Sequence, residues 1–387
     1  MGSFRNVLVA GFAMFAMFFG SGNLVFPLYA GTQTLHQYPF AIMGLLLTAV
    51  VVPFLGLMGM VMFDGDHKEY FASLGPKVSF LLILIILSLL GPFGVVPRCI
   101  TVAYGGVQLL FPNLSLDLFG LIFCLFVAKI IWLHDRIVSI IGSILTPLLL
   151  LGIVLIIAAG FWQDCTPLDQ EVPEHAAFLL GFRQGYHTMD LLAAFFFSIT
   201  TVEYMKKQLK GAGGKRAILR QSLLASFIGA GLLGLVYVCF IALGAQYASE
   251  LVNAQPEQYL TLIAMQTLGG IAKPVVSITI GLACLTTAAI LTTLFGEFFS
   301  EEVTNGKLKR TPALLLSIFT AFLISRIGFA SISVWLQEIL EVVYPALIAL
   351  AIANLLGKPS EKNRRKPVFW IILGISITLK ALMLTFG

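Results

Sequence analysis

Long runs of apolar residues alternate with short polar segments along the whole chain. A helix needs about 20 apolar residues to cross the hydrocarbon core of a bilayer, and eleven runs approach or exceed that length. They lie at residues 7–29, 39–63, 78–110, 116–134, 137–161, 187–205, 218–247, 272–301, 311–328, 332–355 and 367–386. Strands of a transmembrane barrel would instead alternate over about ten positions. The pattern therefore predicts an all-α integral membrane protein with about eleven transmembrane helices.

Composition supports a membrane protein. Hydrophobic residues make up 58% of the chain and charged residues 11%, against about 45–50% and 25% in soluble domains. So little charge cannot cover a soluble protein, which excludes a cytosolic enzyme, a nucleic-acid-binding domain and a secreted disulfide scaffold. The five cysteines are scattered without a CxxC spacing, which favours packing over metal binding. The lipid bilayer is the expected surrounding, and no nucleic-acid partner is expected.

The positive charges predict an orientation. If the N-terminus is cytoplasmic, most of the 24 Lys and Arg residues fall in inside segments. The outside segments and span ends then hold only Arg183, Lys273, Arg326 and Lys380. The expected location is the plasma (bacterial inner) membrane, with the C-terminus outside. The segment MGSFRN is expected to lead into a first span and not to be a removed signal peptide.

Two longer segments are expected outside. Residues 162–186 are acidic and contain proline, and residues 246–271 include a short surface helix from Gln258 to Leu268. The basic inside stretches KKQLKGAGGKR and GKPSEKNRRKP are interpreted as orientation signals and not as binding sites.

The first span is interrupted by FFGSGNLVFP, from Phe18 to Pro27. Each glycine costs about 1 kcal/mol relative to alanine in a helix, and Gly20 and Gly22 flank Ser21 just before Asn23. An irregular backbone survives in a membrane only if it is buried in protein or lines a cavity. A break here would offer amides to a carboxylate and carbonyls to a cation. A close glycine packing face is the alternative.

Two other spans carry buried charge. The sixth begins GYHTMDLLAAFFFSITT, which contains Asp190, a residue that costs about 2.5–3.5 kcal/mol at a membrane centre. The third, 78–110, would make about 50 Å of helix and contains GPFGVVPR, ending at Arg98. Arg98 needs an anionic or carbonyl partner. For both residues a substrate contact and a structural role remain open.

The eighth and tenth spans carry further polar groups. Ala283, Thr286 and Thr287 lie in ACLTTAAILTT, although threonines in such helices usually bond their own backbone. In the tenth span Glu338 and Glu341 share a face, and Tyr344 follows them.

The interruptions repeat along the chain. Residues 7–161 and 187–355 each hold five spans and begin with an interrupted helix, and residues 367–386 add one more. Because five is odd, the second set is inverted relative to the first, as in transporters that bind substrate between broken helices. We expect one membrane transport domain over residues 1–387.

The chain resembles the branched-chain amino acid:cation symporters (BrnQ or LIVCS type) of the amino acid-polyamine-organocation superfamily. The matching stretches are GFAMFAMFFGSGNLVFP, GPFGVVPRCITVAY, GYHTMD, ACLTTA with GEFF, and VVYPALIAL. The resemblance implies a LeuT-type 5+5 inverted repeat with discontinuous helices 1 and 6. It also implies import of leucine, isoleucine and valine with Na⁺ or H⁺, and neither enzymatic activity nor a cofactor. The chain departs from the family at Tyr104-Gly105, where members often have an acidic residue, and in its eleven spans instead of twelve.

The resemblance also implies site residues. The substrate would contact the amides around Gly20, Ser21 and Gly22, and Asn23 would be a second cation ligand. The Na⁺ site would comprise Ala16, Phe19, Ala283, Thr286 and Thr287.

A zwitterionic substrate needs donors for its carboxylate, an acceptor for its ammonium and an apolar wall, and Asp190 is a further candidate for substrate binding. The wall candidates are Phe15, Phe19, Phe195, Phe196 and Phe197. Since one methylene is worth about 1–3 kcal/mol, valine, leucine, isoleucine and methionine should compete. Arg98 and Tyr344 are further candidates.

Other functions remain open. An exchanger or uniporter would replace the ion with Lys or Arg, and no such residue lies near Thr286 in the sequence. A non-transporting amino-acid sensor and a channel are also possible. An intramembrane enzyme is disfavoured because the histidines are isolated and neither HExxH nor GxSxG occurs. Threonine pairs suit Na⁺, whereas Asp190 or Glu297 could carry H⁺ if buried.

Overall fold

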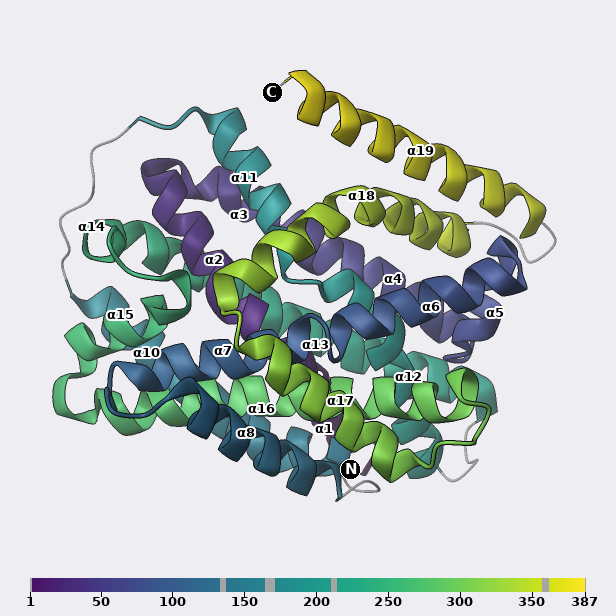
Figure 1. The fold of residues 1–387 in the computed structure, drawn as a ribbon, viewed down its shortest axis with the longest axis horizontal. Helices are drawn as coiled ribbons and strands as arrows, with labels where there is room; N and C mark the ends of the chain where they lie inside the picture. The colour runs from purple at the N-terminus through teal and green to yellow at the C-terminus, as the bar shows by residue number, and fades with distance from the viewer. Residues whose placement is uncertain (1, 133–136, 164–170, 210–213, 357–361, 387) are drawn as a thin grey trace.

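The computed structural model describes residues 2–132, 137–163, 171–209, 214–356 and 362–386, which form helices and short turns (Figure 1). The first half contains α1 (Gly2–Phe18), α2 (Ser21–Thr34), η1 (Leu35–Gln37), α3 (Tyr38–Leu46), η2 (Leu47–Val51), α4 (Val52–Met62), α5 (His67–Phe71), η3 (Ala72–Leu74), α6 (Pro76–Leu90), α7 (Val95–Gln108), α8 (Leu116–Ile131), α9 (Ile137–Ile140), η5 (Ile141–Leu145) and α10 (Thr146–Trp162).

The second half contains α11 (Glu174–His187), α12 (Asp190–Leu209), α13 (Gly214–Gln246), α14 (Ala248–Leu251), η6 (Pro256–Gln258), α15 (Tyr259–Leu268), η7 (Gly269–Ile271), α16 (Ala272–Phe298), η8 (Phe299–Val303), α17 (Arg310–Ser325), α18 (Phe329–Leu356) and α19 (Lys362–Phe386). Most predicted spans coincide with one of these helices or with consecutive helical segments, such as α3, η2 and α4 over residues 39–63. In the described part of the chain, six continuous or broken helices are long and apolar enough to cross a membrane. Two shorter apolar helices, Phe4–Phe18 and Arg310–Ser325, accompany them.

The sixth span begins earlier than the sequence pattern predicts. Residues 162–186 were expected to lie outside, but residues 174–187 form α11, which packs against α3 and α2. The pattern missed α11 because it carries Glu174, Arg183 and His187, and its buried face is made of small residues such as Gly181. It is a half-helix held by protein, so it does not need a continuous apolar surface.

The other expected segments have separate outcomes. The short helix predicted from Gln258 to Leu268 is present as α15, although Tyr259, Leu260, Thr261, Ile263 and Ala264 are buried and do not lie on the surface. Figure 1 places α14 and α15 at one end of the molecule and α5 at the opposite end. The beginning of the 162–186 segment and parts of the two basic stretches lie outside the described residues.

The helices pair reciprocally between the two halves. The first broken helix, α1 with α2, packs on α13 of the second half, and the second broken helix packs through α11 on α3 and through α12 on α4 of the first half. Each interrupted helix therefore lies against the helix that follows its counterpart. This exchange is the arrangement expected of an inverted repeat.

Glycines allow the same close approach in both halves. A Cβ at Gly44 of α3 would lie 2.2 Å from the Phe178 carbonyl oxygen, and one at Gly181 of α11 would lie 2.1 Å from the Ala41 carbonyl oxygen. In the corresponding α1–α13 pair, a Cβ at Gly229 would lie 3.1 Å from the carbonyl oxygen of Gly11. Small residues that let backbones touch are a main source of helix association in lipid.

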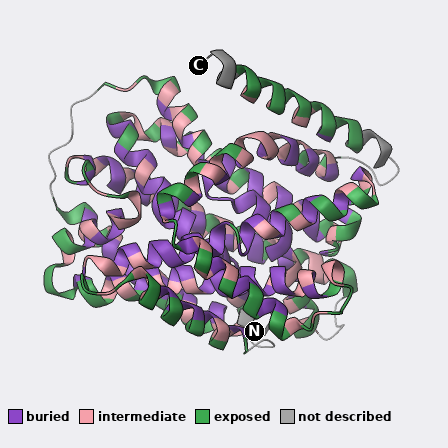
Figure 2. Ribbon diagram, viewed as in Figure 1, coloured by how far each residue is buried: buried purple, intermediate pink, exposed green. Residues whose placement is uncertain are grey.

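A second group of helices covers the bundle formed by the two broken helices (α1 with α2 and α11 with α12), the α3–α4 segment and α13. α16 packs on α7, α8 and α17, and it also touches α1, which brings its threonines to the first break. Buried residues fill the centre of the molecule, whereas α19 is largely exposed along its length (Figure 2). Lys380 of α19 forms ion pairs of 2.9 Å with Glu338 and 2.6 Å with Glu341 of α18. The two glutamates therefore fasten the additional helix to the repeat.

Candidate functional site

The first helix breaks at Phe19 and Gly20, and α2 begins at Ser21. The break is shorter than predicted, because Gly22 and Asn23 already belong to α2. The Gly20 amide does not continue the helix of α1 but donates to Asn23 Oδ1 at 3.1 Å. A Cβ on Gly20 would lie 2.8 Å from both Oγ1 and Cγ2 of Thr287. The glycine is thus required by the close approach of α16.

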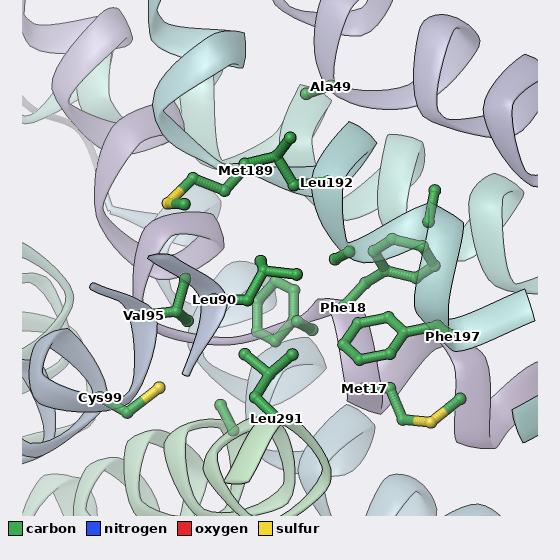
Figure 3. Packing of buried hydrophobic residues seen from close by; sticks show 14 of the residues in the cluster. Met17, Phe18, Ala49, Leu90, Val95, Cys99, Met189, Leu192, Phe197 and Leu291 are labelled. Carbon is green, nitrogen blue, oxygen red and sulfur yellow. The ribbon is translucent and has the colours of Figure 1, made fainter. Parts of the chain in front are cut away.

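The other two interruptions lie beside the first. The sixth helix breaks at Thr188 and Met189, where Met189 adopts a left-handed φ of +64°, and the third breaks between α6 and α7. Figure 3 shows residues that flank all three breaks within one packed region, namely Met17 and Phe18, Leu90 and Val95, and Met189 and Leu192. The predicted meeting of broken helices is therefore present.

Asp190 is the buried anion of this region, with 1% of its surface exposed. Its carboxylate accepts hydrogen bonds from Asn23 Nδ2 at 2.9 and 3.1 Å and from the Tyr237 hydroxyl at 2.6 Å. Asn23 Nδ2 also donates to the Tyr237 hydroxyl. Because Asn23 Oδ1 holds the Gly20 amide, this single side chain joins the break in the first helix to the start of α12.

Two adjacent threonines of α16 face the end of α1. The Thr286 hydroxyl lies 3.0 Å from the Ala16 carbonyl oxygen and 3.1 Å from that of Ala283. The Thr287 hydroxyl lies 3.0 Å from the Met17 carbonyl oxygen and 3.3 Å from that of Ala16. In a continuous helix the Gly20 amide would bond the Ala16 carbonyl, so the break leaves this oxygen available.

Four of the five residues predicted for the Na⁺ site therefore lie together: Ala16, Ala283, Thr286 and Thr287. The carbonyl of Phe19, the fifth, takes no part in these contacts. The sequence reasoning missed Met17, whose carbonyl meets Thr287. The signal was available, because a break frees several consecutive carbonyls at the end of a helix.

Arg98 has the carbonyl partner that the sequence requires. Its Nη1 donates to the backbone oxygen of His187, the last residue of α11, at 3.1 Å. Tyr344 lies nearby and accepts a hydrogen bond of 3.2 Å from the Leu191 amide in the first turn of α12. Arg98 and Tyr344 thus each contact a residue next to the break in the sixth helix.

The phenylalanines predicted to form one apolar wall lie in two different places. Phe15 and Phe19 stack with ring centroids 5.0 Å apart at the end of α1, and Phe197 meets Phe18 edge-on at 5.0 Å. Phe195, in contrast, packs on Tyr70 and Phe71, and Phe196 lies 6.0 Å from the ring of His67. Three consecutive residues of a helix point in different directions, so Phe195 and Phe196 face the α5 segment.

Tyr237 is the functional candidate that sequence reasoning did not find. It lies fully buried in α13, within the predicted span 218–247. A buried tyrosine usually finds a hydrogen-bond partner for its hydroxyl. That rule points to a polar neighbour but not to Asp190, which is far away in the sequence.

A carboxylate does approach the position where the chain departs from its family. A Cβ on Gly105 of α7 would lie 2.8 Å from Cγ of Glu257 in η6. The η6 segment thus brings an acidic group to the end of the third helix.

The polar residues around the breaks have almost no exposed surface. Ser21, Asn23, Arg98, Asp190, Thr286 and Thr287 are all buried. Broken helices that meet inside a membrane protein and pack in reciprocal pairs define an inverted-repeat membrane transporter.

The chain belongs to the family described as branched-chain amino acid transport protein, whose sequence profile matches residues 3–385. A putative branched-chain amino acid carrier protein of Staphylococcus aureus is 31% identical, over 96% of this chain and 87% of the relative. A protein of the same description from Staphylococcus saprophyticus is 30% identical, over 92% and 82% of the two chains. The chain is thus a multi-pass membrane protein of an amino-acid transport family.

Solved transporters share the fold. Mhp1 in an inward-facing conformation matches with a TM-score of 0.61 at 14% identity, over 97% of this chain and 86% of that one. A manganese transporter of Eremococcus coleocola gives 0.60 at 16% identity, over 98% and 86%. A Na⁺-coupled sialic acid symporter gives 0.57 at 11% identity, over 97% and 90%. These likenesses confirm the LeuT-type 5+5 fold with discontinuous helices 1 and 6.

Proposed function

We propose that the protein imports leucine, isoleucine and valine by symport with a monovalent cation through alternating access. The observation that carries this proposal is the cluster of oxygen atoms between the end of α1 and α16. The orientation of the protein in the membrane would follow its positive charges, with the N-terminus in the cytoplasm and the C-terminus outside.

The cluster joins two threonine hydroxyls to two carbonyls at the open end of a helix. The hydroxyls of Thr286 and Thr287 lie within 3.3 Å of the carbonyl oxygens of Ala16 and Met17, which belong to the last turn of α1 before the break. The carbonyls of Leu282 and Ala283, which the Thr286 hydroxyl also approaches, belong to the continuous helix α16. The negative end of the α1 dipole points at the same place. A cation could be held by the two hydroxyl oxygens and the two α1 carbonyls, and a site of neutral oxygen ligands suits a hard cation such as Na⁺.

The substrate would lie on the other side of the break. The first amide N–H groups of α2 have no partners within their own helix and would donate hydrogen bonds to the substrate carboxylate. The Asp190 carboxylate would bind the substrate ammonium. The names of the relatives support branched-chain amino acids as cargo. In the described part of the chain, no three His, Cys, Asp or Glu side chains gather in a metal-binding group, so the manganese transporter is a guide to the fold alone.

Alternating access would use the breaks as hinges. Both half-helix pairs end at buried residues that pack on one another, so a substrate reaches them only when one set of half-helices moves. Cation binding at α1 and α16 would favour the outward-open state, and the coupling free energy is reciprocal between the two ligands.

Leucine uptake into proteoliposomes under separate Na⁺ and pH gradients tests the proposal. We expect a Na⁺ gradient to drive accumulation above the outside concentration. In Thr287→Ala the Na⁺ concentration for half-maximal uptake should rise by about tenfold or more, because a ligand is lost. The matched control is Thr293→Ala, since that hydroxyl bonds its own helix at Ala289.

Each other outcome identifies another function. Accumulation driven only by a pH gradient would make the coupling ion a proton and point to the buried Asp190. Uptake that requires internal amino acid but no gradient would indicate an exchanger. Binding without flux would indicate a sensor and would refute transport.

A further inference from the structure

Arg98 is a buried cation whose hydrogen-bonding capacity is mostly unused. Only 1% of its surface is exposed, and its Nη1 donates to His187. Its Nε and Nη2 have no hydrogen-bond partner. Guanidinium is always charged and acts only as a donor, so these N–H groups can be satisfied only by an acceptor that is not part of the described structure.

One of the unused nitrogens, Nη2, lies at the start of α2. A Cβ on Gly22 would lie 2.4 Å from Arg98 Nη2, so the guanidinium rests against the first turn of this half-helix. The Ser21 hydroxyl in the same turn is also buried without a partner. Arg98 thus adds a full positive charge to the positive end of a helix dipole, an unfavourable arrangement that an anion bound beside both would relieve.

Aromatic rings hold the guanidinium in place. Its Cζ lies 4.8 Å from the centre of the Phe26 ring and 5.7 Å from that of Phe329. These contacts stabilise the cation without using its N–H groups in the guanidinium plane. The His187 carbonyl fixes one corner of that plane, which leaves the edge formed by Nε and Nη2 for a planar, two-oxygen acceptor.

The anion must be small and must arrive with the substrate. Among the described residues, Arg98 has no carboxylate within ion-pairing distance, and the buried Asp190 is held instead by Asn23 and Tyr237. The region of the breaks therefore contains Arg98, a cation with unused hydrogen-bond donors, and Asp190, an anion that already accepts hydrogen bonds from neutral side chains. A zwitterion has the complementary charges, carboxylate toward Arg98 and ammonium toward Asp190.

We propose that Arg98 binds the carboxylate of the transported amino acid through Nε and Nη2, together with the first amides of α2. This assignment rests on the proposed function and gives it a specificity-determining side chain from the third helix. Glycine at position 22 lets Arg98 and the backbone of Thr188 approach α2 this closely, since a Cβ there would lie 2.4 Å from Arg98 Nη2 and 3.2 Å from the Thr188 Cα. The assignment also links substrate binding to α2, α11 and α18, which all touch Arg98.

Competition by leucine analogues tests the proposal in proteoliposomes. Wild type should prefer leucine over leucinamide, which lacks the carboxylate, by at least about a hundredfold, because the donors would otherwise be left unpaired. In Arg98→Gln we expect leucine affinity to fall by about tenfold to a hundredfold, while leucinamide loses much less. The preference should therefore shrink toward one.

Two further variants keep the outcome decisive. Arg98→Lys retains the charge without the two-pronged geometry, so it should show a smaller loss of leucine affinity and a reduced preference, and it replaces Arg98→Gln if that variant does not fold. Arg326→Gln, which removes an exposed arginine paired with Asp117, should leave the preference unchanged. If wild type transports leucine and folded Arg98 variants keep the full preference over leucinamide, the carboxylate assignment is wrong although transport stands. If wild type transports no leucine, the proposed function itself fails.

Discussion

Replacing Asp190 by asparagine is expected to lower leucine uptake by at least about a hundredfold, since each hydrogen bond to a charged group contributes about 1.5–3 kcal/mol. The carboxylate accepts from Asn23 and Tyr237, and an amide would turn its own N–H₂ group toward one of these donors. The substitution also removes the charged acceptor that we propose for the substrate ammonium. Initial rates in proteoliposomes with matched protein content measure the effect.

Two variants separate this role from general stability. Tyr237→Phe removes one hydrogen bond and keeps the charge, so uptake should fall by no more than about tenfold. Asp117→Asn changes an exposed carboxylate that pairs with Arg326 and should have no effect. Near-normal leucine uptake in Asp190→Asn would show that this carboxylate does not take part in transport.

The second large effect is expected at Gly20. A methyl group there would lie 2.8 Å from Thr287 Oγ1, so Gly20→Ala must push this hydroxyl away from the Ala16 and Met17 carbonyls. Overpacking of this kind costs about 1–3 kcal/mol. The Na⁺ concentration for half-maximal uptake should therefore rise by about tenfold to a hundredfold. Gly281→Ala, where a Cβ has no neighbour within 4 Å, is the matched control in α16.

A double-mutant cycle locates the cause of that effect. In a Thr287→Ala background the clashing hydroxyl and methyl are already absent, so Gly20→Ala should cost much less than in the wild type. Residues in contact commonly show interaction energies of about 0.5–3 kcal/mol. Additive effects would mean that Gly20 acts independently of the threonine, and the proposed geometry of the cation site would be wrong.

Much of the fold could be predicted because membrane helices show clear hydropathy. The exception, α11, is short, carries charges and is supported by α3, so no apolar run marks it. The first break was predicted from Gly20 and Asn23, but its narrow extent depends on the Asn23 side chain that restores the helix at once. The pattern of residue types along the chain does not reveal that hydrogen bond.

The candidate site could be predicted only in part, for the same reason. Thr286 and Thr287 were identified by likeness to a family, and the structure brings them to Ala16. Tyr237 was missed because its partner, Asp190, comes from another helix. Phe195 and Phe196 were grouped with Phe197 by adjacency in the sequence, whereas helical geometry turns them toward Tyr70 and His67. Contacts between helices thus determine which side chains belong to the candidate site, and hydropathy does not reveal those contacts.

Equilibrium binding of leucine to the purified protein, titrated at a series of Na⁺ concentrations with choline as the replacement ion, tests the joint site most directly. If both ligands bind at the same breaks, Na⁺ should strengthen leucine binding, and leucine should strengthen Na⁺ binding by the same factor. Thr287→Ala should reduce that factor, and Thr293→Ala should preserve it. A leucine affinity that stays constant across the Na⁺ series at fixed pH would contradict a shared site for amino acid and sodium.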